Sequence, residues 1–172
     1  LFKKYRIHPQ IWKTAHSPRN GTQKSKINEA VKEILPLVKK TRELGCKLGL
    51  YNHGGWGGEP ENLASVCKIL HDQHNATHVG IVYNFHHGHN HINDFNKALK
   101  LMHPYLLCIN LNGMNSNANP KILPIGQGDH EIEMIKELKK INYDGPIGIL
   151  DHRSDTDTKT ALQLNIIGLK NI

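Results

Sequence analysis

The feature that most constrains the fold is a regular alternation between short apolar runs and longer segments with helical periodicity. The apolar runs lack alternation with polar residues, which is typical of strands buried on both faces of a parallel sheet. No hairpin-type turn sequence joins one run to the next. The sequence therefore predicts an α/β fold in which helices connect parallel strands. Strands are expected at residues 7–14, 46–52, 78–84, 105–112 and 145–150.

Helices are expected between these strands. From Ile27 to Leu44, apolar residues recur at helical spacing, with Ser25 as the candidate N-cap and Gly45 as the terminator. Pro60 suits the first position of the next helix, because its missing N–H would be unpaired there anyway. Further helices are expected at about 92–102 and 129–141, and a last one runs from near Asp155 or Asp157 to the end of the chain.

Two parallel architectures share this pattern, a doubly wound sheet and a (β/α)₈ TIM barrel. About five βα units fit into the chain, whereas a complete barrel typically needs ~250 residues. The chain also opens at "LFKKYRIHPQIW", in the middle of an element and without an initiator methionine. We therefore interpret residues 1–172 as a single domain that forms an incomplete barrel, with the first strands missing.

Composition argues against some classes of partner. Lys and Arg total 22 against 15 Asp and Glu, a formal charge of +7, which would suit an anionic substrate or nucleic acid. However, the lysines are scattered over predicted helices and are not grouped with aromatic residues, so we expect no nucleic-acid partner. No apolar stretch approaches the ~20 residues of a membrane span, so we expect no membrane partner. Cys46, Cys67 and Cys108 have apolar neighbours and predict reduced core thiols, which favours a cytoplasmic location.

Polar residues gather where the predicted strands end. "YNHGGWGG" follows one strand, "YNFHHGHNH" the next, "INLNGMN" the third and "LDHRSD" the last. A single asparagine at such a position is usually a turn former, but four successive strands that each supply Asn, His or Asp favour a pocket. The carboxyl ends of parallel strands build the active site in this class of fold. We therefore expect a ligand site at this face.

The residue types at the expected site suit a sugar. Asn110 and Asn112 are two positions apart, so their side chains leave the strand on the same side, and amides pair well with hydroxyl groups. The alternative is that both amides support loops. Trp56 is either a stacking platform for a sugar face or a lid. The run "HHGHNH" offers imidazoles for a metal, although such a local run is more often a polar loop with one or two functional members.

At these residues the sequence resembles the xylose-isomerase-like TIM barrel family, which includes sugar phosphate isomerases and epimerases. The matching stretches are "LGLYNHGG", "GIVYNFHHGH", "LLCINLNGM" and "GQGDHEIEMIKELKKINYDGPIGI". The last is the most specific, with a Gly-x-Gly-Asp turn, a helix and a Tyr-Asp-Gly strand entry. The resemblance extends from Cys46 to the end and is thinner over residues 1–45. It implies the barrel and makes the doubly wound sheet the second choice.

The resemblance also implies one divalent metal, held by Glu, Asp, His and Glu at four strand ends, that polarises a sugar while carboxylates move the proton. In this sequence those positions fall on Tyr51, Asn84, Asn110 or Asn112, and Leu150. A phenol, neutral amides and an aliphatic chain are poor substitutes for carboxylates and an imidazole around a hard cation. We therefore expect no metal and no other cofactor.

Three hypotheses remain open, all with a small-molecule carbohydrate as ligand. In the first, the protein is a sugar isomerase- or epimerase-like enzyme without the usual metal, and His53 and His87 are the acid/base pair. In the second, it is a non-catalytic carbohydrate-binding module of a longer polypeptide. In the third, histidines rebuild a zinc or manganese site. The residues expected to bind the sugar are Asn52, Trp56, Asn84, Asn110 and Asn112, and the histidines of the third hypothesis are His53, His87, His89 and His152.

Overall fold

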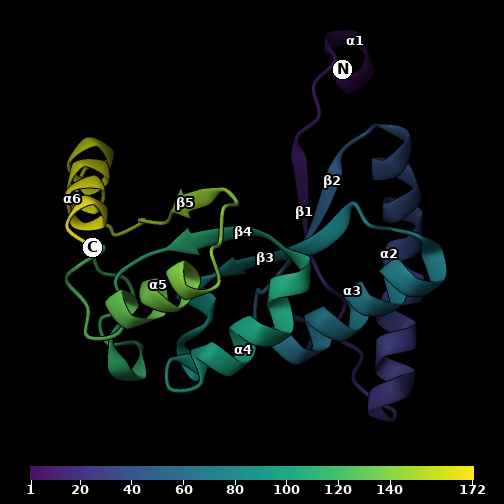
Figure 1. The fold of residues 1–172 in the computed structure, drawn as a ribbon, viewed down its shortest axis with the longest axis horizontal. Coiled ribbons are helices and arrows are strands. Elements are labelled where there is room, and N and C mark those ends of the chain that lie inside the picture. The colour runs from purple at the N-terminus through teal and green to yellow at the C-terminus, as the bar shows by residue number, and fades with distance from the viewer. The chain divides into compact units, whose positions relative to one another are not determined.

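The computed structural model describes all of residues 1–172 and contains five strands that alternate with helices (Figure 1). The strands follow one another in the sheet in chain order. β1 pairs with β2, β2 with β3, and β4 with β5, each time in parallel, which confirms the predicted α/β class. Each strand lies inside the range predicted for it. The strands are β1 (Gln10–Thr14), β2 (Lys47–Tyr51), β3 (Val79–Asn84), β4 (Leu106–Leu111) and β5 (Ile147–Ile149).

Contacts between residues divide the chain into two compact units. The first consists of 1–82 and 104–107, and the second of 83–103 and 108–172. The single domain over residues 1–172 stays a prediction. None of the helices has both the length and the apolar character needed to cross a membrane. The helices of the first unit are α1 (Phe2–Tyr5), α2 (Gln23–Glu43) and α3 (Pro60–His74), and those of the second are α4 (Phe95–Met102), α5 (Glu131–Lys140) and α6 (Thr158–Lys170).

In the first unit, α2 packs beside α3 (Figure 1). α2 begins after Thr22, whose Oγ1 accepts the backbone N–H of Ser25 at 3.2 Å. The expected N-cap at Ser25 is therefore wrong, because that residue already lies in the first turn and uses its N–H toward the true cap. Gly45 follows the helix with φ +66, the left-handed conformation expected of a terminator. Pro60 stands at the start of α3, as predicted.

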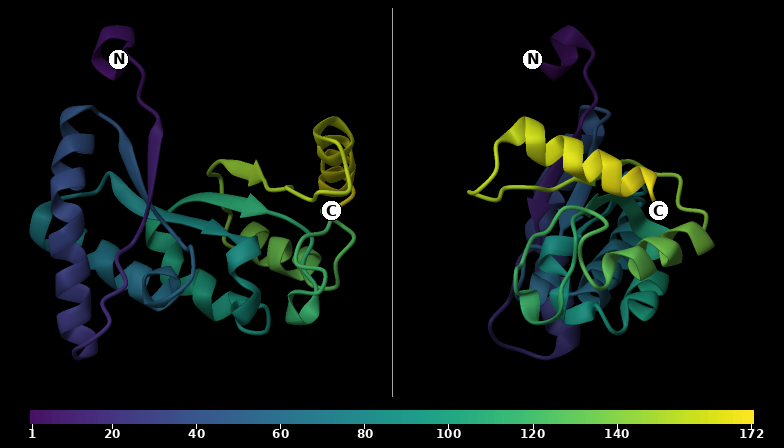
Figure 2. Two further views of the ribbon diagram at one scale, coloured as in Figure 1. Left: turned by 180° about the vertical axis from the view of Figure 1, so that it is seen from behind. Right: turned by 90° about the vertical axis from the view of Figure 1, so that its left-hand side faces the viewer.

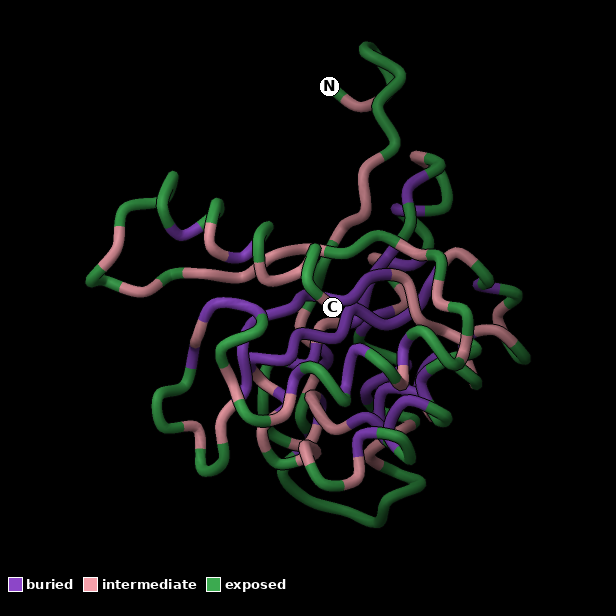
Figure 3. Tube along the Cα trace, turned by 60° about the vertical axis from the view of Figure 1, so that its left-hand side comes forward, coloured by how far each residue is buried: buried purple, intermediate pink, exposed green.

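The strands carry much of the core. Figure 3 colours the buried parts of the chain purple. Every residue of β3 is buried, as expected for a strand covered on both faces. At Gly49 of β2, an added Cβ would lie 2.4 Å from Cγ2 of Val82, so glycine is required for this close packing. The three cysteines Cys46, Cys67 and Cys108 are free and buried, which confirms their prediction as reduced core residues.

In the second unit, β5 lies beside β4 (Figure 2), and α6 buries only Ala161 and Asn165. Asp157 caps α6 with its side chain, as expected. Asn165 fixes the helix to the rest of the unit. Its Oδ1 accepts the backbone N–H of Ile125 at 2.9 Å, and its Nδ2 donates to Oδ2 of Asp151 at 2.8 Å. Polar contacts thus hold a helix that contributes little to the apolar core.

A buried carboxylate organises the long segment between β4 and α5. Glu131 is fully buried in the first turn of α5. Its two oxygens accept the backbone N–H groups of Met114 at 2.9 Å, Gly126 at 2.9 Å and Gly128 at 2.8 Å. Three charge-assisted hydrogen bonds compensate for the loss of water around this carboxylate. Glu131 therefore holds together the segment that also supplies part of the candidate site.

Candidate functional site

A cavity of about 500 Å³ lies in the second unit, among the segments that follow three strands. His86 follows β3, residues 120–123 belong to the segment after β4, and residues 152–155 follow β5. These segments leave the carboxyl ends of the strands, which is where parallel α/β proteins place their active sites. The lining includes His86, Lys121, Leu123, His152, Arg153 and Asp155.

The turn after β3 directs His86 into this cavity. Asn84 is the last residue of β3, and its Oδ1 accepts the backbone N–H of His86 at 3.1 Å. This bond caps the single 3₁₀ turn over Phe85–His87. The His86 residue is only 9% exposed, and its Nδ1 is buried without a hydrogen-bond partner. Because buried polar atoms are almost always paired in folded proteins, this nitrogen indicates a place for a ligand atom.

His86 stands among cationic or potentially cationic groups. The ring centroids of His87 and His152 lie 4.6 Å and 5.0 Å from that of His86, both edge to face. Burial, followed by the charges of Lys121, His87, His152 and His89, lowers the pKa of His86 to about 4. The imidazole is therefore neutral at pH 7. In that state it offers one N–H donor and one nitrogen acceptor.

The wall after β5 is fixed by a partly buried ion pair. Nε and Nη2 of Arg153 donate to the two carboxylate oxygens of Asp151 at 3.0 Å and 3.1 Å. Asn165 donates to the same carboxylate. Burial alone would raise the pKa of Asp151, but these hydrogen bonds outweigh it and lower that pKa below its usual value. Most of the charge of Arg153 is thus compensated inside the protein.

Asn110 and Asn112 are both buried in the second unit but are not among the residues that line the cavity. The side-chain oxygen of Asn110 lies over Gly148 of β5, where an added Cβ would approach it to 2.1 Å. Nδ2 of Asn112 donates to the carbonyl of Gly113 at 2.8 Å and approaches the sulfur of Met114 at 3.3 Å, while its Oδ1 is buried without a partner. A role in sugar binding stays a prediction for both amides.

Two of the predicted site residues follow β2 in the first unit. Asn52 is buried, and its backbone N–H donates to the carbonyl of Val82 at 3.3 Å. His53 is exposed, with its ring 5.9 Å from that of Tyr51. His53 belongs to the first unit and His87 to the second, so their acid/base partnership stays a prediction.

Trp56 also lies in the first unit, where it links two helices. Its indole N–H donates to Oε1 of Gln23 in α2 at 3.0 Å. Its backbone carbonyl accepts from Nδ2 of Asn62 in α3 at 2.7 Å. These bonds give Trp56 a structural role, and the sugar-stacking role remains a prediction.

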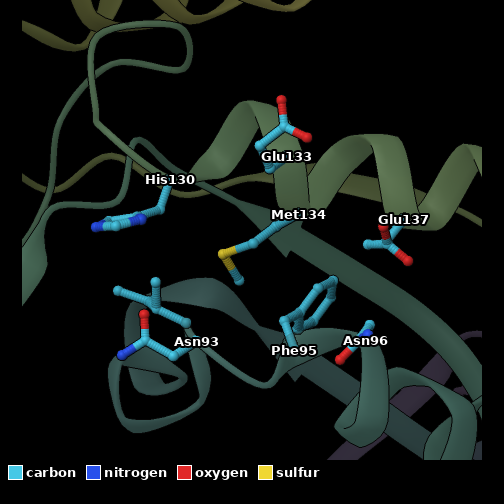
Figure 4. A pocket seen from close by; sticks show the side chains of 8 residues that line it. Asn93, Phe95, Asn96, His130, Glu133, Met134 and Glu137 are labelled. Carbon is cyan, nitrogen blue, oxygen red and sulfur yellow. The ribbon is translucent and has the colours of Figure 1, made fainter.

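A second cavity, of about 200 Å³, is lined by α4, α5 and the residues before them (Figure 4). Phe95 and Met134 form its apolar floor, and Glu133 and Glu137 stand along one side. Each of these carboxylates already forms an ion pair with the lysine three residues further along α5. This cavity therefore lacks the unpartnered buried polar group that distinguishes the first one.

Sequence-based reasoning did not single out most of the residues that line the first cavity, His86 and Lys121 among them. It selected His87 from the histidine run, whereas His86 lines the cavity, and it did not consider Lys121. The signal for His86 was Asn84 two positions earlier, a residue type that caps tight turns. The signal for Lys121 was only its position in the segment between the third predicted strand end and the next helix.

Comparisons with known proteins agree with the fold. The family described as xylose isomerase-like TIM barrel matches residues 4–168. An uncharacterised protein of Methanocaldococcus jannaschii is 26% identical over 147 residues, which cover 82% of this chain and 46% of that protein. The chain thus spans about half the length of this curated relative. The family match confirms the expected barrel type over the doubly wound sheet.

Solved structures that resemble the fold include an epimerase and a zinc-containing protein. The D-psicose 3-epimerase of Clostridium cellulolyticum H10, determined with D-tagatose, has a TM-score of 0.67 at 13% identity, covering 99% of this chain and 65% of that one. The IOLI protein with a zinc atom has a TM-score of 0.72 at 14% identity, covering 99% and 64%. At these identities the likeness concerns the fold alone, and the chain spans less than two thirds of either protein.

The absence of the divalent metal that this type of barrel implies stays a prediction, which rests on the chemistry of the residues at the expected ligand positions. In the second unit, the positions that the resemblance assigns to the metal ligands fall on Asn84, Asn110 or Asn112, and Leu150. The side-chain oxygen of Asn84 accepts the backbone N–H of His86 and so caps a turn. The side-chain nitrogen of Asn112 donates to the carbonyl of the adjacent Gly113. Leu150 has no donor atom. A hard cation prefers several carboxylate oxygens, and this set offers none.

Proposed function

Because the chain belongs to the xylose isomerase-like TIM barrel family, we propose that it acts on a small carbohydrate at the carboxyl ends of its strands, as an isomerase- or epimerase-like enzyme without the usual divalent metal. The observation that carries this proposal is the buried, unpartnered Nδ1 of His86 in the cavity. The activity of the whole protein is part of the proposal, because the chain spans only part of its relatives.

The cavity suits a sugar in size and in character. Its volume of about 500 Å³ falls within the range of pockets that bind small molecules, roughly 300–1,000 Å³. Imidazole and hydroxyl groups of His86, His152 and Ser154 can pair with sugar hydroxyls. Ile122 and Leu123 offer apolar surface for the C–H face of a ring. One similar structure is that of an epimerase with D-tagatose, which supports the same class of ligand here.

Epimerisation next to a carbonyl requires removal and return of a carbon-bound proton, with negative charge developing on the carbonyl oxygen. With a pKa of about 4, His86 is a weak base at pH 7, but its neutral ring can donate an N–H to that oxygen. A neutral histidine can serve as such an electrophile. His87, whose ring lies beside that of His86, is then the acid/base group, with His53 as its predicted partner.

The test is proton exchange by purified, chelator-treated protein with a panel of ketohexoses that includes D-tagatose. We expect deuterium from D₂O to enter the sugar, and His87→Gln to slow this exchange by about 10²-fold or more. His103→Gln, at an exposed position outside the cavity, is the matched control and should retain the wild-type rate. Sugar binding without exchange would support the binding module instead. Absence of both binding and exchange would refute the carbohydrate proposal.

A further inference from the structure

The net positive charge of the chain is concentrated in its N-terminal part. Residues 1–28 hold seven of the 22 Lys and Arg residues and none of the 15 Asp and Glu residues, so the remaining residues carry no formal net charge. The charge is thus less evenly scattered than the predicted helices suggested. All of residues 1–28 belong to the first unit. The seven cations are Lys3, Lys4, Arg6, Lys13, Arg19, Lys24 and Lys26.

None of these seven cations forms an ion pair, whereas several lysines elsewhere in the chain do. Lys4 instead lies over the ring of Tyr5, with its Nζ 5.3 Å from the centroid, a contact that leaves its charge without an anion. The first carboxylates of the chain, Glu29 and Glu33, each lie 2.9 Å from a ring nitrogen of His16. The excess persists when every carboxylate of the first unit is counted, with 13 Lys and Arg against six Asp and Glu. An anionic partner can therefore use this charge.

An edge strand lies within the same segment. β1 stands first in the strand order of the sheet and pairs with β2 on one side only (Figure 1). The backbone N–H and C=O groups on its other side can pair with a further strand. Trp12 of β1 is 46% exposed, and its ring is stacked on that of Tyr51 in β2 with the centroids 5.9 Å apart. Because side chains alternate along a strand, Lys13 leaves β1 on the face opposite to Trp12.

We propose that β1 binds an extended segment of another protein that is rich in Asp and Glu, and that this segment joins the sheet as a further strand beside β1. In this mode of recognition, main-chain hydrogen bonds supply affinity and alternate side chains supply specificity. An apolar side chain of the partner then lies beside Trp12, and an acidic one lies beside Lys13 on the other face. The exposed side chains of Tyr5 and Ile7 extend the apolar contact before the strand begins.

The charge and the backbone together select this partner over others. A second copy of the chain would bring the same seven cations to the same edge, and like charges across an interface repel each other. A nucleic acid or an anionic membrane would neutralise the cations but could not continue the ladder of backbone hydrogen bonds beyond β1. An acidic extended peptide uses both features. This inference does not depend on the proposed function.

The test is calorimetric titration of the protein with a capped peptide of alternating Glu and Val. We expect binding, accompanied by a shift of the tryptophan emission to shorter wavelength that Trp12→Phe abolishes. The combined variant Lys3→Gln, Lys4→Gln and Lys13→Gln should weaken the peptide by about tenfold, the joint effect of losing three exposed charge contacts. The matched control changes three exposed, unpaired lysines of the second unit and should leave the affinity unchanged. These are Lys97→Gln, Lys100→Gln and Lys170→Gln.

Control probes separate strand addition from simple charge attraction. A Glu–Val peptide with methylated backbone nitrogens keeps the charges but cannot donate to a strand, so it should bind about tenfold more weakly or worse. Equal affinity of the methylated peptide, or of a Lys–Val peptide, overturns the proposal. Absence of binding of the Glu–Val peptide, or equal weakening by both triple variants, overturns it as well. Oligothymidylate or phosphatidylserine vesicles that bind more tightly than the Glu–Val peptide and displace it assign the cations to a nucleic acid or a membrane instead.

Discussion

The imidazole rings of His86 and His152 lie edge to face, with their centroids 5.0 Å apart and their planes at 75°. His86 lies in the turn Phe85–His87 that follows β3, and His152 lies in the segment that follows β5. Segments that leave the carboxyl ends of different strands therefore meet at one cavity, which is the arrangement expected of an active site in this class of fold. The lining around these two rings also includes the lysine Lys121.

The first prediction concerns Glu131, which holds the segment between β4 and α5. Glu131→Gln replaces a carboxylate by an amide whose NH₂ group must face backbone N–H donors. We expect the free energy of unfolding to fall by about 2–4 kcal/mol, because buried donors lose their acceptor. Denaturant titration measures this loss. Glu133→Gln on the exposed side of α5 should change stability by less than about 0.5 kcal/mol, and an equal loss in both variants would contradict the account.

The second prediction concerns the ion pair behind the cavity wall. Asp151→Ala leaves Arg153 without its bidentate partner and removes an acceptor of Asn165. We expect a loss of about 2–3 kcal/mol in the free energy of unfolding at pH 7. Because the pKa of Asp151 is lowered in the folded protein, its contribution is present above the unfolded pKa and disappears as the pH falls through the folded one.

The matched control for Asp151→Ala is Asp155→Ala. Asp155 is exposed and accepts a hydrogen bond only from the adjacent Thr156, so its removal should cost less than about 0.5 kcal/mol. Chemical denaturation of both variants between pH 7 and pH 3 provides the measurement. A stability difference between wild type and Asp151→Ala that persists unchanged at pH 3 would show that the ion pair is not its source.

The third prediction uses the lowered pKa of His86. The folded state resists protonation until about pH 4, whereas the unfolded chain binds this proton near pH 6.5. The contribution of the neutral His86 ring to the free energy of unfolding is therefore fully present above pH 6.5. It decreases as the pH falls toward the pKa of His86 in the folded protein. At ~1.4 kcal/mol per pH unit, His86 should account for a loss of about 3 kcal/mol between pH 7 and pH 4.

Urea denaturation across this pH range tests the prediction. His86→Gln should remove this part of the pH dependence, and His103→Gln, which changes an exposed histidine, should keep it. NMR titration of the ring protons of His86 gives an independent value. A His86 pKa near 6.5 in the folded protein would contradict the described environment.

The sequence predicted the strands well because their signal is local. Each strand is a short apolar run between polar segments, and burial on both faces requires such a run. The first residue of α2 was harder to predict from the sequence, since Thr22 and Ser25 are both good N-cap residues. Only the backbone geometry shows which of them accepts a hydrogen bond. α1, over Phe2–Tyr5, was not expected, because four residues carry too little periodicity to indicate a helix.

The candidate site was predictable in position but not in detail. The polar strand ends indicated the face at which this cavity lies, because the topology of parallel sheets determines where the strand ends lie. The histidine run could not show which imidazole turns inward. That choice depends on how the backbone turns after β3, and this is set by the 3₁₀ turn over Phe85–His87 that Asn84 caps. Lys121 reaches the cavity through a long irregular segment, and no periodicity in the sequence connects it to the site.

The central claim is that this barrel binds and converts a carbohydrate without a divalent metal. The most direct measurement is the metal content of the purified protein by mass spectrometry, combined with sugar binding and deuterium exchange before and after exhaustive dialysis against a chelator. We predict substoichiometric metal throughout, with binding and exchange unchanged by dialysis. Stoichiometric zinc or manganese that survives simple dialysis, and is lost together with activity in His87→Ala, would contradict the claim.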